Sequence, residues 1–256
     1  MSDAYIKTGG STLSQLGLPK CSPGSTTILP PTVTSMLANI RASSYIPSAK
    51  KDSCHSAAEA LLNAGFSPAF VAGVLANIVY EGSVGQFESS AYANQAQRPD
   101  YLVYMDTYYS YRTLYSGRFI YNVNVTNVYN ILTTLHNQGW RVGGSRAGFG
   151  LGSVQWTFER TYTLVKLYRE VNGNSSTITL AQATRAEALM ITRELQGPYR
   201  FVYSNWQSSN PNANTVTAAY NAGYAVCVSY EVPVDAATKG RVRGELAQRI
   251  FTDMMK

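Results

Sequence analysis

Apolar residues recur at three- and four-residue spacing along much of the chain, which is the pattern of amphipathic helices. The clearest case is the stretch 68–81, where Phe70, Val74 and Ile78 belong to one apolar stripe. Ser67 is a favoured residue for capping a helix N-terminus, and Pro68 suits the first helical position. The pattern therefore predicts a buried helix that begins just after Ser67.

Glu81 is the residue of this stretch that does not fit its surroundings. It falls three residues after Ile78, on the apolar side of the helix, and Gly82 follows at once. A carboxyl group among apolar neighbours has a raised pKa, which suits a general acid. Glycoside cleavage uses such an acid to protonate the leaving oxygen. The alternative is an ordinary helix-terminal glutamate that reaches into water.

The same reasoning predicts further helices, and strands and loops between Gly82 and Gly152, where Gly, aromatic and β-branched residues dominate. The fold class is α+β, mainly α, with a small β-containing region directly after Glu81. This layout predicts two lobes with Glu81 at their junction, where clefts form. The other predicted helices are Thr32 to Ala42, one opened by the capping box Ser56 to Glu59 and stopped at Gly65, one from near Thr126 to Gly139, Phe158 to Val171, Leu180 to Gln196 behind a Thr179/Gln182 capping box, Thr215 to Tyr230, and Asp235 to Met254.

Composition divides the chain into two parts. Residues 1 to about 30 are rich in Gly, Ser, Thr and Pro. We predict an extended N-terminal arm or linker with a short helix over 1–50, and one folded domain over 51–256. An insertion over about 95–147 contains a dense run of tyrosines. Exposed tyrosines suit stacking on glycan and contact with another protein equally well.

The charge of the chain favours an acidic partner. With 14% charged and 45% hydrophobic residues the chain is globular, and its formal net charge is +6. Nucleic acid, anionic membranes and anionic cell walls would all attract it. The longest basic run is Lys50-Lys51 and no nucleic-acid motif is found, so nucleic acid ranks low. No stretch approaches the ~20 apolar residues of a membrane span, and the first residues lack the features of a signal peptide.

The cysteines do not indicate a metal site. Cys21, Cys54 and Cys227 follow no zinc-ligand spacing, and neither a metal nor another cofactor is expected. Cys21 and Cys54 are candidates for a disulfide. A peptidase or amidase would need a Cys/His pair or zinc. Cys54-His55 are sequence neighbours and do not suggest such a pair, and no motif surrounds Cys227 and His136.

Several segments together carry a family resemblance. Gly148-Phe149-Gly150-Leu151-Gly152-Ser153-Val154-Gln155-Trp156 follows the Glu81 helix and the irregular region, and Glu231-Val232-Pro233 precedes an Arg-rich last helix. These segments resemble the phage-tail lysozyme group of the lysozyme-like superfamily. Ala218-Ala219-Tyr220-Asn221-Ala222-Gly223 is similar to the A-Y-N-A-G helix of lytic transglycosylases. The resemblance covers about residues 53 to 256.

The resemblance implies a lysozyme-like two-lobed fold and roles for particular residues. Glu81 would be the general acid, and Gly82 replaces the serine that usually follows it. A second carboxylate has no clear position. Glu88 is the candidate, and its plainer interpretation is a solvated loop charge. The resemblance also implies substrate-binding or supporting residues. Gln155 would bond an N-acetyl group or Glu81, Tyr220 would orient Glu81, and Ser83 would supply the replacement hydroxyl. Trp156 would stack on a sugar or pack inside, and Gly150 and Gly152 would let a sugar approach the backbone closely.

The implied function is that of a peptidoglycan hydrolase, an N-acetylmuramidase that cleaves the β-1,4 bond between N-acetylmuramic acid and N-acetylglucosamine. One alternative is a lytic transglycosylase acting on the same bond. Another is a non-catalytic protein that binds the cell wall or serves as a structural phage tail component. The expected partners are glycan strands and other phage tail proteins. The expected location is the virion tail, or the bacterial cell wall after release.

Overall fold

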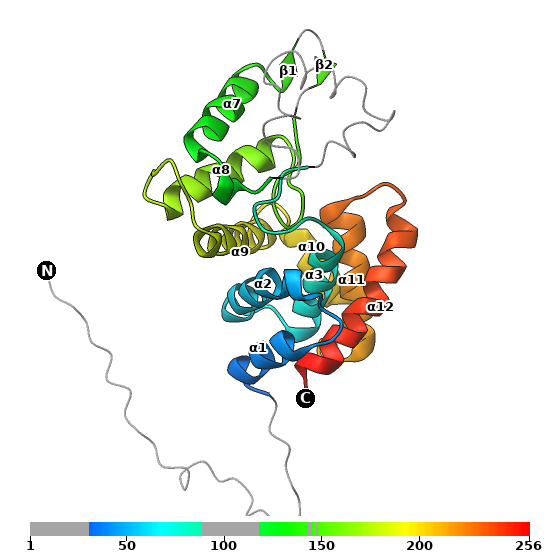
Figure 1. Ribbon diagram of the computed structural model, residues 1–256. Coiled ribbons are helices and arrows are strands. Elements are labelled where there is room, and N and C mark those ends of the chain that lie inside the picture. Colours follow the sequence, from blue (N-terminus) through cyan, green and yellow to red (C-terminus); the bar gives the residue numbers. More distant parts are fainter. Residues whose placement is uncertain (1–30, 89–117, 143–144, 147) are drawn as a thin grey trace, which may run out of the picture. The chain divides into compact units, whose positions relative to one another are not determined.

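The computed structural model describes residues 31–88, 118–142, 145–146 and 148–256 (Figure 1). Residues 31–256 form one compact unit. Most of the tyrosine-rich insertion lies outside the described residues, so the roles predicted for its tyrosines stay predictions. The described part of the unit is mainly helical, as the sequence predicts.

Three helices form the centre of the unit: α3 (Pro68–Tyr80), α11 (Val216–Val226) and α12 (Ala236–Met254). Glycines allow them to cross closely. A Cβ added at Gly73 would lie 2.6 Å from Cβ of Ala222, and one at Gly223 would lie 2.6 Å from the carbonyl oxygen of Arg243. No larger residue fits at these crossings without moving a backbone. The close crossing brings the middle of α12 beside the end of α3.

The predicted boundary between arm and domain near residue 50 differs from the packing. α1 (Val33–Ala42) contacts α2 (Lys51–Asn63) and α12, and its Met36 and Ile40 are buried in the common core. The helix assigned to the arm is therefore part of the compact unit. The predicted start of α2 at Ser56 is also wrong, because a 3₁₀ turn over Ser48–Lys50 leads directly into the helix at Lys51.

A second group of helices follows the irregular region. α7 (Val125–Asn137) contacts α8 (Glu159–Val171), and α8 contacts α9 (Leu180–Gln196). α9 also contacts α2, so it joins the two groups (Figure 1). The predicted capping box of α9 is confirmed, since the Thr179 side chain and the Gln182 side chain each accept the other residue's backbone N–H.

Two differences from the prediction follow α9. The helix α10 (Arg200–Ser209) was not predicted, although Val202 and Trp206 pack into the core. The helix predicted over Thr215 to Tyr230 stops being α-helical at Val226 and continues as a π-helical turn over Cys227–Glu231. This turn ends at Val232, which has the left-handed φ of 48°.

The β structure after Glu81 is slight among the described residues. β1 (Arg141–Val142) pairs antiparallel with β2 (Ser145–Arg146). Three isolated bridges join Gln86 to Phe119, Phe87 to Leu151, and Leu151 to Trp156. The bridge between Phe87 and Leu151 ties the segment after Glu81 to the glycine-rich turn at 148–156.

Candidate active site

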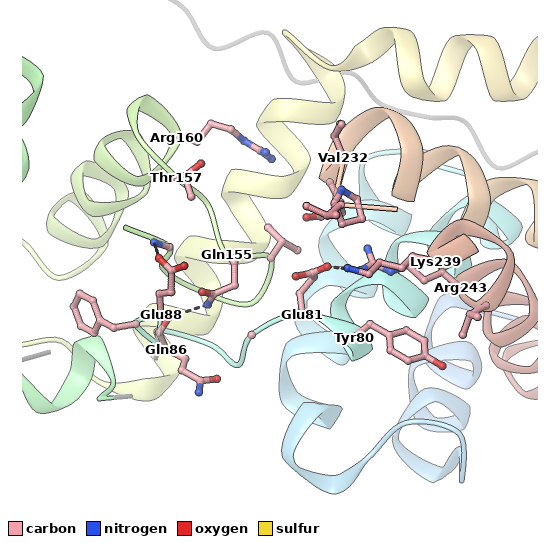
Figure 2. A pocket seen from close by; sticks show the side chains of 18 of the residues that line it. Tyr80, Glu81, Gln86, Glu88, Gln155, Thr157, Arg160, Val232, Lys239 and Arg243 are labelled. Atoms are coloured by element: carbon pink, nitrogen blue, oxygen red, sulfur yellow. Dashed lines mark hydrogen bonds and ion pairs between the residues drawn. The ribbon is translucent and has the colours of Figure 1, made fainter. Parts of the chain in front are cut away.

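A cleft of about 980 Å³ opens at the end of α3, and Glu81 lies in its wall (Figure 2). Its lining combines acidic, basic and exposed apolar side chains. Figure 2 shows Gln86 and Glu88 on one side of the cleft and Lys239 and Arg243 on the other. The lining residues are Tyr80, Glu81, Gly82, Gln86, Phe87, Glu88, Gly150, Val154, Gln155, Thr157, Arg160, Glu231, Val232, Pro233, Val234, Thr238, Lys239, Val242 and Arg243.

Glu81 ends α3 as predicted, but its carboxylate has a cationic neighbour. The Glu81 N–H donates to the carbonyl of Ile78 at 3.3 Å, and one carboxylate oxygen accepts from Nη2 of Arg243. The Glu81 side chain is 20% exposed. The apolar surroundings predicted for this carboxylate are therefore wrong, because the helix stripe ends one turn before it and α12 supplies a guanidinium there.

Arg243 is held in place by all three central helices. Its side chain is 5% exposed, and its Nη1 donates to Oδ1 of the buried Asn77 at 2.8 Å. The amide nitrogen of Asn77 donates to the carbonyls of Gly73 at 2.8 Å and Gly223 at 3.1 Å. The amide oxygen and the amide nitrogen of Asn77 thus both have hydrogen-bond partners inside the helix crossing. The network fixes the direction from which Arg243 meets Glu81.

The backbone just after α3 is held from two sides. Nζ of Lys50 donates to the carbonyl of Glu81 at 2.6 Å and to that of Gly82. Burial lowers the pKa of Lys50. A Cβ at Gly82 would lie 2.3 Å from Nε2 of Gln155 and 2.5 Å from the carbonyl oxygen of Gly152. This close approach explains why glycine stands where serine is usual.

In the glycine-rich turn, Gly150, Gly152 and Gln155 contact neighbouring protein groups at close range. Gln155 has a left-handed φ of 51°, and its Nε2 donates to the carbonyls of Gln86 at 3.1 Å and Gly152 at 2.9 Å. A Cβ at Gly152 would lie 2.8 Å from the Trp156 ring, and one at Gly150 would lie 2.6 Å from Oε1 of Gln155. Gln155 lines the cleft, but its amide nitrogen already donates to the backbone carbonyls of Gln86 and Gly152.

Two buried glutamates of α9 hold this side of the cleft. Glu187 accepts the N–H groups of Gly85 at 2.6 Å and Ser153 at 2.8 Å, and the hydroxyl of Tyr168 at 2.5 Å. Burial raises the pKa of Glu187. Because one carboxyl bonds both the segment after Glu81 and the glycine-rich turn, it fixes their relative position. The sequence gives no sign of this role beyond a glutamate on the apolar side of a helix.

Glu194 supports the opposite edge of the turn. It accepts from Nε1 of Trp156 at 3.0 Å, from Nε and Nη2 of Arg160 at 2.8 and 2.9 Å, and from the hydroxyl of Tyr230 at 2.5 Å. Trp156 is fully buried, so of its two predicted roles packing is confirmed and sugar stacking is wrong. Arg160 reaches from this network into the cleft.

Among the described residues, neither Tyr220 nor Ser83 hydrogen-bonds the Glu81 carboxylate, which accepts from Arg243 instead. The Tyr220 ring packs against α12, where a Cβ at Gly244 would lie 2.8 Å from it, and Arg243 makes the contact that was expected of Tyr220. Ser83 donates its N–H to Oε1 of Gln86 at 2.9 Å. Asn221 bonds Oδ1 of Asn210 at 2.8 Å.

Glu88 is not a solvated loop charge. It is buried, its Oε2 accepts the N–H of Gly150 at 3.0 Å, and its own N–H donates to the Gly150 carbonyl at 2.9 Å. The reason is the pairing of its segment with the glycine-rich turn, which local sequence does not reveal. Glu88 lines the same cleft as Glu81.

Glu231 was not predicted as a site residue. It ends the π-helical turn, lines the cleft, and its buried Oε1 has no hydrogen-bond partner among the described residues. Burial, and next the charge of Glu81, raise the pKa of Glu231 to about 8. The Glu231-Val232-Pro233 segment was noticed in the sequence, but the burial of its carboxyl depends on packing between distant helices.

Neither of the two cysteines that the structure describes lines the cleft. Cys54 is a fully buried thiol whose pKa is raised by burial to about 12, and Cys21, the candidate partner for a disulfide, lies outside the described residues. Cys227 is also buried, and its Sγ lies 3.7 Å from the carbonyl of Ala236. His136 instead bonds Glu159 at 2.9 Å. Within the described ranges no cluster of His, Cys, Asp and Glu suits a metal ion.

Comparison with protein families places the chain in a known class. Residues 53–254 match the family model described as phage tail lysozyme, a class of lysozyme-like cell-wall hydrolases. The match spans most of the chain, and the chain belongs to the phage tail lysozyme family. Comparison with curated proteins and with solved structures gives no match. In the part of the chain that the structure describes, no helix is both long and apolar enough to cross a bilayer.

Proposed function

We propose that the protein cleaves the β-1,4 bond between N-acetylmuramic acid and N-acetylglucosamine in peptidoglycan, with Glu81 as the general acid. The observation that carries this proposal is a glutamate at the end of a buried helix, directed into a large cleft and oriented by a buried arginine. A carboxyl group in such a position can protonate the leaving oxygen of a glycoside. Membership of the phage tail lysozyme family supports the substrate class.

The contact with Arg243 assigns a further task to Glu81 in this proposal. A guanidinium that hydrogen-bonds a carboxyl group can stabilise the carboxylate form that a proton transfer leaves behind. That form exists after the proton has passed to the leaving oxygen, and it can then take a proton from the water that attacks the sugar. Glu81 would therefore act first as acid and then as base. Arg243 would stabilise the state between these two steps.

Other residues of the cleft would hold the glycan strand. Gln86, Gln155 and Thr157 present polar groups, while Val232 and Val234 are 63% and 78% exposed and offer an apolar rim to sugar rings. Glu88 is the proposed candidate for a second carboxylate, because it lines the same cleft. In a two-lobed lysozyme-like fold this cleft would lie between the lobes. We further propose that the protein works from the virion tail or at the cell wall.

The variant Glu81→Gln tests this function. The amide has nearly the same size and can still accept a hydrogen bond from Arg243, but it cannot protonate a leaving group. We expect clearing of purified peptidoglycan to fall by roughly 100-fold or more, the usual range for loss of a general acid. Glu59→Gln, on the exposed side of α2, is the matched control and should clear at the wild-type rate. Equal clearing by Glu81→Gln and wild type would refute the role of Glu81. Absence of clearing by the wild type would favour a non-catalytic tail or wall-binding protein.

A further inference from the structure

Glu231 is the carboxyl group of the cleft that the proposed mechanism leaves without a task. Its Oε1 is buried and has no hydrogen-bond partner among the described residues. Such a group costs free energy of folding, and a functional role is one reason for a protein to keep it. Glu231 lines the same cleft as Glu81. The two glutamates come from different elements, the end of α3 and the π-helical turn after α11, so their presence in one cleft is a product of the fold.

The backbone that carries Glu231 is strained. The π-helical turn over Cys227–Glu231 is closed by the N–H of Val232, which donates to the Cys227 carbonyl at 2.9 Å. Val232 adopts φ 48°, a left-handed conformation that costs a β-branched residue about 1–2 kcal/mol. Its side chain is 63% exposed, so burial of Val232 does not repay that cost. Strain and π-helical turns of this kind are common at functional sites.

The charges around the two glutamates differ. One carboxylate oxygen of Glu81 accepts a hydrogen bond from the Arg243 guanidinium. Glu231 has no such bond among the described residues, and it lies near the charge of Glu81. Two neighbouring carboxyl groups in one site do not both ionise readily. The charged and titratable groups that act on Glu231 are Glu81 from α3, Arg160 from α8, Glu194 from α9, Arg243 from α12, and Cys227 and Tyr230 from its own turn. Lys239 of α12 lines the same cleft.

We propose that Glu81 and Glu231 act as a carboxyl pair, in which Glu231 is the resting site of the proton that Glu81 gives to the glycosidic oxygen. The inference rests on the proposed role of Glu81 as general acid. Glu231 is a positioning residue that acts through Glu81, because it holds the proton that Glu81 then receives. When substrate binds, the proton moves from Glu231 to Glu81, and Glu81 gives it to the glycosidic oxygen as the bond from C1 to that oxygen breaks. The attacking water loses a proton to Glu81, and that proton returns to Glu231.

The pH dependence of kcat in Glu231→Gln tests the pair. In the wild type we expect activity to persist up to about pH 8, where Glu231 loses its proton, and to fall above it. In Glu231→Gln the alkaline fall should begin at least one pH unit lower, with KM little changed. Glu245→Gln, exposed on α12, is the control and should keep the wild-type profile. An unchanged profile, or an equal loss of kcat at every pH, would overturn the inference.

A second measurement does not depend on whether Glu231→Gln folds. Carbon-13 NMR of protein labelled at the glutamate carboxyl carbons should show one group titrating near pH 8. In Glu81→Gln the same signal should titrate at lower pH, because the charge of Glu81 raises the pKa of Glu231. Glu187, whose pKa is raised by its own burial, should not move. The inference fails if no carboxyl titrates above about pH 6, or if the Glu81 substitution shifts none.

The two proposals fail in different ways. Activity retained by Glu81→Gln would remove the proposed mechanism and the pair together. An inactive Glu81→Gln with an unshifted profile in Glu231→Gln would remove the pair alone. The NMR titration reports on the pair even in protein that shows no clearing activity.

Discussion

At the scale of the residue, the central contact is the ion pair between Glu81 and Arg243. Arg243 bonds Glu81 with one nitrogen and Asn77 with another, and a planar guanidinium is needed to do both. A lysine keeps the charge but cannot reach both partners in the same geometry. The orientation of the Glu81 carboxylate therefore depends on arginine and not on charge alone.

This dependence predicts the outcome of Arg243→Lys. We expect kcat to fall by about 100-fold, as when a catalytic group is displaced by roughly 1 Å, with little change in KM. Arg241→Lys, exposed on the same helix, is the control and should be neutral. Steady-state kinetics on soluble glycan fragments measures both constants. A kcat equal to that of the wild type in Arg243→Lys would contradict the role given to this contact.

Residue patterns predicted Glu81 but not its partners. The apolar stripe and the following glycine locate Glu81 because both signals lie within a few positions of it. Arg243 lies 162 positions away, and its contact with Glu81 depends on how α3 and α12 cross. The sequence motif around Tyr220 therefore led to Tyr220 as the residue that orients Glu81, whereas no local motif indicated Arg243. Glu231 was missed because its burial arises from distant elements.

At the scale of the element, the site depends on close helix crossings. Asn77 on α3 receives Arg243 from α12 and bonds the carbonyl of Gly223 on α11, so all three helices must keep their spacing. A Cβ at Gly223 would lie 2.6 Å from the Arg243 carbonyl and 2.9 Å from Cβ of Ala247. An added methyl group would push α12 away from α11. The shift would move Arg243 relative to Glu81.

Gly223→Ala should therefore lower both stability and activity. Overpacking of this kind costs about 1–3 kcal/mol, which corresponds to a fall in Tm of about 2–12 °C in a domain of this size. Thr217→Ala, exposed on the same helix, should leave Tm within about 1 °C, as expected for a surface site. Thermal unfolding followed by circular dichroism measures both. The packing account would be wrong if Gly223→Ala melted with the wild type and kept its full activity.

Two helices with local start signals were predicted at their first residues, whereas the capping-box pattern at Ser56 does not mark the start of α2. α3 begins after its Ser67 cap and α9 after its capping box, both at the predicted residues. α10 was missed because its N-cap residue, Tyr199, makes no side-chain capping bond. The π-helical turn was missed because the left-handed conformation of Val232 is one that a valine rarely adopts. Sequence signals thus failed where tertiary packing overrides local preference.

At the scale of the whole molecule, the cleft has one side formed at the central helices and an opposite side formed by two loop segments. The central helices supply Glu81, Arg243 and the strained segment around Val232, while the segment after α3 and the glycine-rich turn supply the opposite side. Glu187 joins the two loops of that opposite side through its hydrogen bonds to Gly85 and Ser153. The net charge of +6 favours approach to an anionic cell wall. The mainly helical class was predictable from periodicity, and the order of elements predicted a cleft beside Glu81, but neither predicted Arg243 or Glu231 in its wall.

The products of peptidoglycan digestion test the account most directly. Purified peptidoglycan would be digested by the wild type and by Glu81→Gln, and the released fragments identified by mass spectrometry. The account predicts fragments with reducing-end N-acetylmuramic acid from the wild type and about 100-fold fewer from Glu81→Gln. A 1,6-anhydro end would indicate a lytic transglycosylase instead. Reducing-end N-acetylglucosamine, cleaved peptides with intact glycan, or equal product from both proteins would contradict the account.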